Sequence, residues 1–280
     1  MNPERISFIT FTRDSAPRIK GLMEDVKDVV DEIIVIDGYS KDDTVGIAER
    51  YGARVWKRRP WGYADPDRMF ALRKASYEWV LYLDDDERLG KKLKSELKDL
   101  VAGARDRNID AFSTTRIDFD GGSLILGPFY TKQTRLYRKS KVRYKGLVHE
   151  LPIVNGVTEE LPDVYYILHR QEKWDWNKSL HYARLEALEY SSKYGHEKSR
   201  SLIRPMLWRL APISVIPLYL YNLSVGRKHL NASTLLPAFR WTLYESIKRM
   251  LMNIRNKDEI ARAKMIEEKG LIQLLGLDTD

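Results

Sequence analysis

The strongest constraint on the fold is a regular alternation of short apolar runs with amphipathic segments in the first hundred residues. The apolar runs are typical of buried strands and comprise Ile6–Phe11, Glu32–Ile36, Arg54–Lys57 and Trp79–Leu83. The segments that follow them have helical spacing and comprise Ala16–Val29, Asp42–Tyr51, Asp67–Ser76 and Lys91–Val101. Strands that alternate with helices build βαβ units, in which the strands run parallel. The sequence therefore predicts an α/β fold whose mainly parallel sheet carries helices on both faces.

Beyond Asp110 the pattern changes to strand-like segments separated by turns that contain glycine. The predicted strands are Ala111–Phe119, Gln133–Arg138 and Val142–Gly146. We expect them to extend the sheet as mixed or antiparallel strands. From Asn177 onward helical spacing returns, interrupted by prolines. The sequence thus predicts an α/β domain over residues 1–170 and a helical C-terminal region over residues 171–280.

The chain has no cysteine among its 280 residues, which excludes zinc ribbons, iron–sulfur clusters and thiol nucleophiles. Any chemistry must therefore use carboxylates, histidines and hydroxyl groups. The formal net charge of +8 lies between Arg200 and Arg255, where nine basic residues accompany one acid, Glu245. This basic stretch also carries tryptophans and tyrosines. The combination favours a surface for anionic lipid over a nucleic-acid groove spread across the protein.

One segment within the basic stretch, Leu210–Gly226, has no charged residue. Its 17 residues are fewer than the roughly 20 that a transmembrane helix needs, and two prolines interrupt it. It can lie in a membrane interface or pack as a buried helix pair on the rest of the protein, and the sequence leaves both open. The N-terminal segment has no pattern of a secretory signal. We therefore expect a cytoplasmic protein that associates peripherally with the inner face of the cell membrane.

The segment after the fourth apolar run is strongly acidic. The run Trp79–Leu83 leads directly into Asp84, Asp85, Asp86 and Glu87. Open α/β sheets bind ligands at the carboxyl ends of their strands, and in an extended chain Asp84 and Asp86 would point the same way. Clustered carboxylates resist ionising together unless a cation compensates them, which favours Mn²⁺ or Mg²⁺. The alternative is a solvated acidic turn before the next helix.

Two other predicted strands also end in polar residues. Asp37 closes the second strand, and Thr10, Thr12 and Arg13 close the first. The threonines can shape a pocket for a nucleobase, Asp37 can accept hydrogen bonds from a base or ribose, and Arg68 can pair with a phosphate. No glycine-rich phosphate loop occurs, which disfavours P-loop kinases and dinucleotide dehydrogenases. These residues favour a nucleoside diphosphate as ligand, with a metal ion to neutralise its phosphates.

Three segments together carry a resemblance to a known family. ISFITFTRD, DEIIVIDGYSKDDT and YADPDRMFALRKASYEWVLYLDDDERL resemble successive blocks of the family 2 glycosyltransferases, which have the nucleotide-sugar-binding GT-A fold. Their order and spacing resemble the branch of lipopolysaccharide-core glucosyltransferases and related peptide glycosyltransferases. The similarity covers about residues 5 to 100 closely and extends more loosely to Glu150. Gly38-Tyr39 and Met69 depart from the family pattern, which leaves the identity of the donor open.

The resemblance implies a role for each matching position at the donor site. Thr10 and Thr12, with Arg13 beside them, would line the nucleobase pocket. Asp37 would bind the base or ribose, and Arg68 would approach the diphosphate.

The resemblance also implies a metal site. The run Asp84-Asp85-Asp86 stands at the family's D-x-D signature. Asp86 is then the expected direct metal ligand, with Asp84 as a further candidate. His169 follows another apolar run and is a candidate third ligand, as in various GT-A enzymes. A structural or surface histidine is the alternative for that position.

Sugar transfer also needs a base that takes the proton of the acceptor hydroxyl. Glu150, in the block GLVHE, is the candidate base, and His149 is the neighbouring alternative. A surface glutamate in a loop is the third interpretation.

The sequence therefore predicts a metal-dependent inverting glycosyltransferase that uses a nucleotide diphosphate sugar and either Mn²⁺ or Mg²⁺. The acceptor would be a glycan or a lipid-linked or lipopolysaccharide-type hydroxyl at an anionic membrane surface, in cell envelope glycan biosynthesis. A sugar nucleotidyltransferase and a non-catalytic nucleotide-sugar-binding module are the alternatives. The nucleotidyltransferase would need a phosphate loop rich in glycine and arginine after the first strand, and TFTRDSAPR lacks the glycines.

Overall fold

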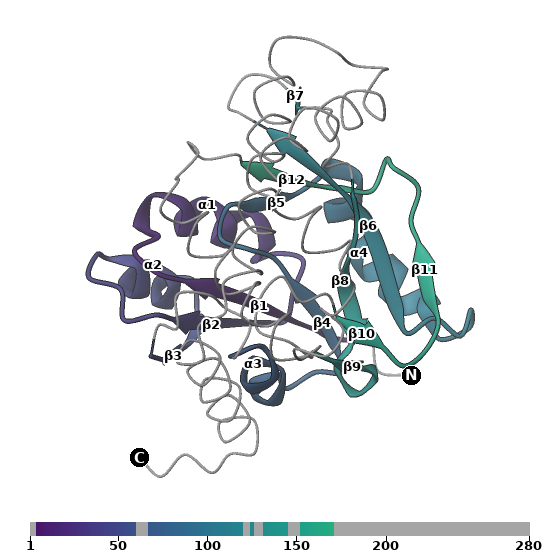
Figure 1. Cartoon of the computed structure of the whole chain (residues 1–280), viewed down its shortest axis with the longest axis horizontal. Coiled ribbons are helices and arrows are strands. Elements are labelled where there is room, and N and C mark those ends of the chain that lie inside the picture. The colour runs from purple at the N-terminus through teal and green to yellow at the C-terminus, as the bar shows by residue number, and fades with distance from the viewer. Residues whose placement is uncertain (1–3, 60–66, 120–123, 126–130, 145–151, 171–280) are drawn as a thin grey trace, which may run out of the picture. The chain divides into compact units, whose positions relative to one another are not determined.

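The computed structural model describes residues 4–59, 67–119, 124–125, 131–144 and 152–170, which form an α/β unit around one large sheet (Figure 1). The expected C-terminal region 171–280, and with it the basic stretch, lies outside the described residues. The same is true of His149 and Glu150. None of the described helices has the length and apolar character that crossing a bilayer requires.

The first half of the sheet is parallel. Its strands are β1 (Ile6–Thr12), β2 (Glu32–Asp37), β3 (Arg54–Lys57) and β4 (Trp79–Tyr82), in the spatial order β3-β2-β1-β4. The helices are α1 (Ala16–Val26), α2 (Thr44–Arg50), α3 (Arg68–Lys74) and α4 (Lys91–Ala104). The predicted alternation is therefore confirmed. The strand ends lie within one residue of their expected places, whereas α1 ends earlier than predicted.

The second half of the sheet is mixed. Its main strands are β8 (Thr131–Arg138), β6 (Ala111–Phe119), β12 (Tyr166–Arg170) and β5 (Glu87–Leu89), in that spatial order next to β4. β8 is antiparallel to both β4 and β6, so β4 and β6 run parallel, and β12 runs parallel to β6. Two minor strands, β7 (Leu124–Ile125) and β11 (Thr158–Glu160), pair with β6. Two others, β9 (Val142–Arg143) and β10 (Ile153–Val154), form a separate two-stranded sheet. A short 3₁₀ helix, η2 (Lys139–Lys141), connects β8 to β9.

The core lies on both faces of the sheet because successive strand residues point to opposite faces. On one face Phe8 packs with apolar residues of α1 and α4, including Leu22 and Leu97. On the other face Ile9 packs with α3 through Leu72. Each large apolar side chain buried in this way contributes about 1.5–3 kcal/mol. The predicted fold class, a mixed and mainly parallel sheet with helices on both faces, is confirmed.

The topology also decides where strand ends meet. The carboxyl ends of β1, β2, β4, β6 and β12 lie at the same edge of the sheet, since these strands all run in one direction. β5 was not predicted as a strand, and it begins at Glu87, the last residue of the acidic segment. Its antiparallel pairing with β12 brings two segments that are distant in sequence to this edge.

Candidate active site

Asp37 and Thr12 occupy the carboxyl ends of β2 and β1, where they are direct neighbours in the strand register. Asp37 is fully buried. Its carboxylate accepts hydrogen bonds from the backbone N of Ser40 at 2.9 Å, from the Ser40 hydroxyl, and from Thr12 Oγ1 at 3.4 Å. Thr10 is buried on β1, the strand that ends in Thr12, and its hydroxyl has no hydrogen-bond partner within the described residues. Buried polar atoms usually find a partner, which marks this edge as a place for a polar ligand.

The loops that follow β1 and β2 are tied to each other by hydrogen bonds. The backbone N of Asp14 donates to Ser40 Oγ at 2.8 Å, and the backbone N of Lys41 donates to Asp14 Oδ1 at 2.7 Å. Tyr39, directly before Ser40, has a φ of 57° and an exposed side chain. Arg13 is also exposed at the edge. The two loops thus form one fixed rim beside Asp37.

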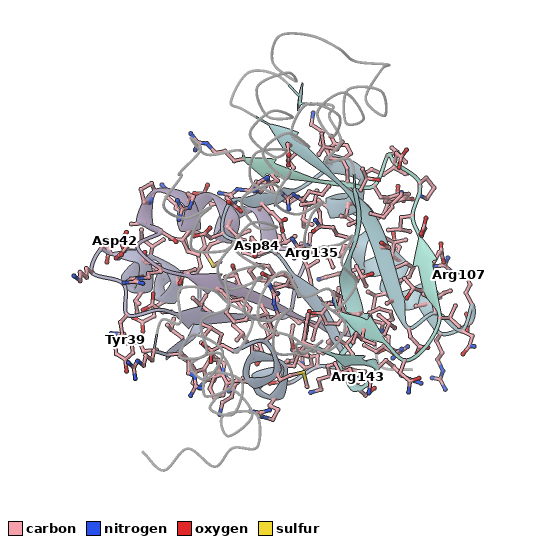
Figure 2. All side chains as sticks on the ribbon, viewed as in Figure 1. Tyr39, Asp42, Asp84, Arg107, Arg135 and Arg143 are labelled. Carbon is pink, nitrogen blue, oxygen red and sulfur yellow. The ribbon has the colours of Figure 1, made fainter. Side chains whose placement is uncertain are left out.

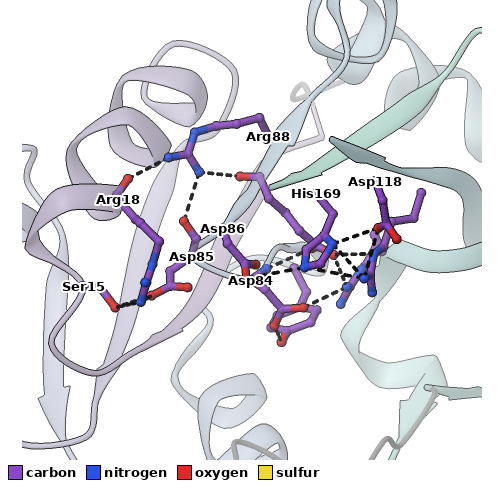
Figure 3. Close-up of polar contacts among 12 residues, drawn as sticks. Ser15, Arg18, Asp84, Asp85, Asp86, Arg88, Asp118 and His169 are labelled. Atoms are coloured by element: carbon purple, nitrogen blue, oxygen red, sulfur yellow. Dashed lines mark hydrogen bonds and ion pairs between the residues drawn. The ribbon is translucent and has the colours of Figure 1, made fainter. Parts of the chain in front are cut away.

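The three aspartates after β4 have three different sets of partners, which Figure 3 shows side by side. Asp84 accepts hydrogen bonds from the hydroxyl of Tyr82 and from Arg135 Nη2 at 3.0 Å. Asp85 accepts them from the hydroxyl of Ser15 and from Arg18 Nη2 at 2.9 Å, which fixes the acidic turn to the start of α1. Asp86 Oδ2 lies 3.5 Å from Nε2 of His169.

The chain is not extended across this segment, because Asp85 and Asp86 form a turn. The spacing argument that directed Asp84 and Asp86 to one object was therefore wrong about the local geometry. The turn instead directs each of the three carboxylates toward a different partner. Of the first and third aspartates, Asp86 is the one that faces the histidine.

Glu87, the fourth acid, is fully buried and binds a buried arginine. Arg135 Nη2, from β8, donates to Glu87 Oε1 at 2.6 Å, and Arg116 Nε from β6 lies 3.9 Å from the same oxygen. Burial raises the pKa of Glu87. Burial alone would also raise the pKa of Asp84, but Arg135 and Arg68 hold it below its usual range. Arginines from other parts of the chain thus compensate two acids for which the sequence had suggested a metal ion.

His169 lies near the end of β12, where a carboxylate faces each of its ring nitrogens (Figure 3). Nδ1 is 2.9 Å from Asp118 Oδ1, and Nε2 is the atom that faces Asp86. Burial lowers the pKa of His169, but hydrogen bonds to Asp118 and Asp86 outweigh it and raise the pKa to about 9. The structure therefore places His169, the candidate third metal ligand, beside the acidic segment.

Asp118 and Arg116 were missed by the sequence analysis. Both belong to β6, which was predicted as a strand over the same residues. They occupy alternate positions near its end, and the Asp118 side chain is only 4% exposed. Charged residues at alternate positions of a buried strand are unusual, and that pattern was the signal available in the sequence.

Asp86 and His169 fit the requirements of a divalent metal site in part. Within the described ranges, no group of three or more histidine, aspartate and glutamate side chains is arranged to hold a metal ion. Two side chains are nevertheless enough for an ion that takes its other ligands from phosphate and water. Adjacent ligands of an octahedral ion at about 2.1 Å lie about 3.0 Å apart, close to the observed 3.5 Å. Both side chains are also partly exposed, at 21% and 19%.

Arg68, at the start of α3, lies against aromatic rings. Its guanidinium carbon is 4.6 Å from the ring centre of Tyr82 and 5.3 Å from that of Tyr144. Phe11 of β1 is a third neighbour, at 5.7 Å. Arg68 also lowers the pKa of Asp84, so the two charged groups are close enough to interact.

Comparison with known proteins gives a consistent set of relatives. Residues 7–155 match the family described as Glycosyl transferase family 2. An uncharacterised glycosyltransferase of Rickettsia felis is 36% identical over 153 residues, which are 52% of this chain and 52% of the relative. The SPbeta prophage-derived glycosyltransferase SunS of Bacillus subtilis is 31% identical over 147 residues, 50% of this chain and 33% of SunS. The chain spans about half the length of the Rickettsia relatives it matches.

Among solved structures, S. aureus TarS residues 1–349 in complex with UDP aligns over 95% of this chain and 92% of its own, with 17% identity and a TM-score of 0.49.

Proposed function

This chain belongs to glycosyl transferase family 2, and from that premise we propose that it transfers a sugar from a nucleoside diphosphate sugar to an acceptor hydroxyl. The observation that carries the proposal is the meeting of Asp86 with His169 at the sheet edge that also holds Asp37. Ser15, three residues after Thr12, binds Asp85 and so connects the two parts of this edge. Polar groups for a nucleotide and a pair of side chains for a metal ion, at one sheet edge, are what a sugar nucleotide requires.

We assign each described residue of the proposed donor site one role. Asp37 accepts a hydrogen bond from the base or the ribose, and its described partners are the neutral donors Thr12 and Ser40. Thr10 and Thr12 line the pocket beside it. Arg13 and Arg68 approach the phosphates from the rim and from α3. Asp85 holds the acidic turn against α1.

Asp86 and His169 are the residues that would hold a divalent cation. The imidazole favours Mn²⁺ over Mg²⁺, because Mg²⁺ binds through oxygen. Asp84, which the sequence also suggested as a ligand, is bound by Tyr82 and Arg135. The cation would neutralise negative charge on the leaving diphosphate.

The proposed transfer proceeds with inversion. A base removes the proton of the acceptor hydroxyl, whose oxygen forms a bond to the anomeric carbon. The bond from that carbon to the diphosphate oxygen breaks on the opposite face, and the nucleoside diphosphate leaves with the bonding electron pair. Glu150, with His149 as the alternative, remains the predicted base.

We propose a lipid-linked or lipopolysaccharide-type acceptor at an anionic membrane surface. The support is the sequence of the basic stretch between Arg200 and Arg255. The full chain should sediment with vesicles that contain anionic lipid and much less with neutral vesicles. Replacing Arg227 and Lys228 with glutamine should weaken this sedimentation. Equal sedimentation with both vesicle types would contradict the membrane proposal without affecting the donor site.

The central experiment measures binding of UDP, GDP and dTDP to the full chain by calorimetry, with and without Mn²⁺. We expect one nucleotide to bind, and Mn²⁺ to tighten its binding by about tenfold or more, since the cation and the phosphates bind each other. Asp86→Asn and His169→Ala should remove most of the Mn²⁺ effect. Asp106→Asn, at an exposed position after α4, is the matched control and should behave like the wild type.

A donor-hydrolysis and transfer assay with the sugar form of the bound nucleotide then separates the alternatives. Release of nucleoside diphosphate supports a glycosyltransferase. Formation of a sugar nucleotide from a nucleoside triphosphate and a sugar phosphate would support a nucleotidyltransferase. Nucleotide binding without turnover on a broad acceptor panel would support a binding module. If Mn²⁺ had no effect in the wild type, the metal site would be refuted.

A further inference from the structure

Strand pairing fixes the position of His169 between two carboxylates. β12 lies between β5 and β6, and in this register His169 is opposite Glu87 on one side and Asp118 on the other. Residues that pair directly across strands project to the same face of the sheet. The same pairing joins the backbone N of Arg170 to the carbonyl of Asp86 at 2.9 Å. The pairing with β6 thus places His169 beside Asp118, and the pairing with β5 places it beside Asp86, the residue before Glu87.

The two ring nitrogens of His169 have separate acceptors. Nδ1 lies 2.9 Å from Asp118 Oδ1, and Nε2 lies 3.5 Å from Asp86 Oδ2. A ring that binds a metal through one nitrogen carries a single proton on the other. If that proton is on Nδ1, the ring donates it to Asp118 and leaves the Nε2 lone pair facing Asp86. A histidine that binds a metal needs a free lone pair of this kind, and a second carboxylate commonly fixes it.

Arg116 would favour the opposite tautomer of His169, with the proton on Nε2. Its Nη2 also lies 2.9 Å from Nδ1 of His169. A guanidinium can only donate, so this bond would require an unprotonated Nδ1. The neutral ring would then carry its proton on Nε2, directed at Asp86, and could not bind a cation there. Asp118 opposes this arrangement, because a carboxylate can only accept and its Oδ1 lies 2.9 Å from Nδ1, while the same oxygen also accepts from Arg116 Nη2 at 3.4 Å.

We propose that Asp118 is a positioning residue that selects the Nδ1-protonated form of His169 and so prepares Nε2 to bind the divalent cation. This inference rests on the proposed function. Asp118 acts through the histidine, whereas Asp86 offers an oxygen of its own. Removing such an outer carboxylate usually weakens metal binding by about 10- to 100-fold.

The test uses Mn²⁺ alone as the probe, with the paramagnetic resonance signal of free Mn²⁺ reporting affinity for the full chain. Asp118→Asn should weaken binding by about 10- to 100-fold. In a His169→Ala background the same substitution should change the affinity by less than about twofold, since nothing remains to be positioned. Asp163→Asn is the control. It removes a carboxylate that binds Thr115 of the same strand at 2.8 Å, and it should leave the affinity unchanged.

A second measurement needs no variant. Nitrogen NMR of the wild type loaded with Zn²⁺, a diamagnetic cation that imidazole binds well, should show His169 protonated at Nδ1 and not at Nε2. A proton on Nε2 would overturn the proposal. So would an equal loss of Mn²⁺ affinity from Asp118→Asn in both backgrounds, or no loss where His169→Ala causes one. If neither Asp86→Asn nor His169→Ala weakened Mn²⁺ binding, the proposed metal site itself would fail, which is a different and distinguishable result.

Discussion

Asp37 and Glu87 are both fully buried acids of the same sheet, yet they have different partners. Asp37, in the parallel half, accepts hydrogen bonds from the neutral groups of Thr12 and Ser40. Glu87, in the mixed half, is bound by Arg135 at 2.6 Å. Neutral donors stabilise a carboxylate without cancelling its charge, whereas an arginine cancels it. Asp37 therefore remains able to attract a ligand, whereas Glu87 stabilises the packing of strands through its ion pair with Arg135.

The mixed half should therefore be the more sensitive to loss of a charge. Figure 2 labels two arginines that test this, Arg135 within the sheet and Arg107 at its margin. Arg135→Met leaves the fully buried Glu87 with only the more distant Arg116, and it removes one arginine from Asp84, whose side chain is 40% exposed. Breaking the buried pair should therefore cost about 3–5 kcal/mol in the free energy of unfolding. Urea denaturation at neutral pH would measure it. This is the largest effect that we predict.

Arg107→Met is the matched control for that variant. Arg107 pairs with Glu159 at the surface, where the two side chains are 44% and 30% exposed. Exposed ion pairs contribute little, so the loss should be below about 1 kcal/mol. Similar losses from both substitutions would mean that burial of the Arg135 pair does not decide its importance, and the comparison of the two halves would fail.

The parallel half should respond through ligand binding. Asp37→Asn retains the shape of the side chain but removes its charge. We expect nucleoside diphosphate affinity to fall by about 10- to 100-fold, because a hydrogen bond to a charged group is worth about 1.5–3 kcal/mol. Calorimetric titration would measure it. Asp42→Asn, in the loop before α2, is the control. An unchanged affinity for Asp37→Asn would remove this residue from the donor site.

The smallest effect concerns Glu32, at the start of the strand that ends in Asp37. Burial alone would raise the pKa of Glu32, but hydrogen bonds from Ser7, Ser76 and Arg54 lower it overall. A lowered folded pKa means that the stabilisation is present above the unfolded value of about 4.3 and is lost as the pH falls through the folded value.

We therefore expect Glu32→Gln to lose at most about 1 kcal/mol of unfolding free energy at pH 7, with the difference from wild type shrinking toward pH 3. Denaturation curves at both pH values would measure it. Glu49→Gln, at an exposed position of α2, should show no such trend. A difference that grew on acidification would contradict the sign of this prediction.

Much of the parallel half of the sheet could be predicted, because each strand and helix there is indicated by the residues of its own segment. Runs such as Trp79–Leu83 and the helix spacing between them reflect side-chain periodicity, which each segment carries by itself. The residues at the ends of β1 and β2 were found for the same reason, since parallel neighbours end at one edge. The turn at Asp85 and Asp86 was predicted only as an alternative to an extended chain, because a short loop is set by the contacts that hold its ends.

The mixed half was predicted less well because its contacts are made between distant segments. The strand Ala111–Phe119 was found with its correct bounds, but nothing in the sequence said which strands would lie beside it. That pairing decides that Asp118 meets His169 and that Arg135 meets Glu87.

The sequence by itself thus determined the α/β class, the acidic segment after the fourth strand and the polar ends of the first two strands. Only the tertiary structure decided that Asp86 faces His169, that Asp118 faces the other ring nitrogen, and that arginines compensate Asp84 and Glu87. The physical reason is that hydrophobic periodicity acts within a segment, whereas charge pairing depends on strand order and register.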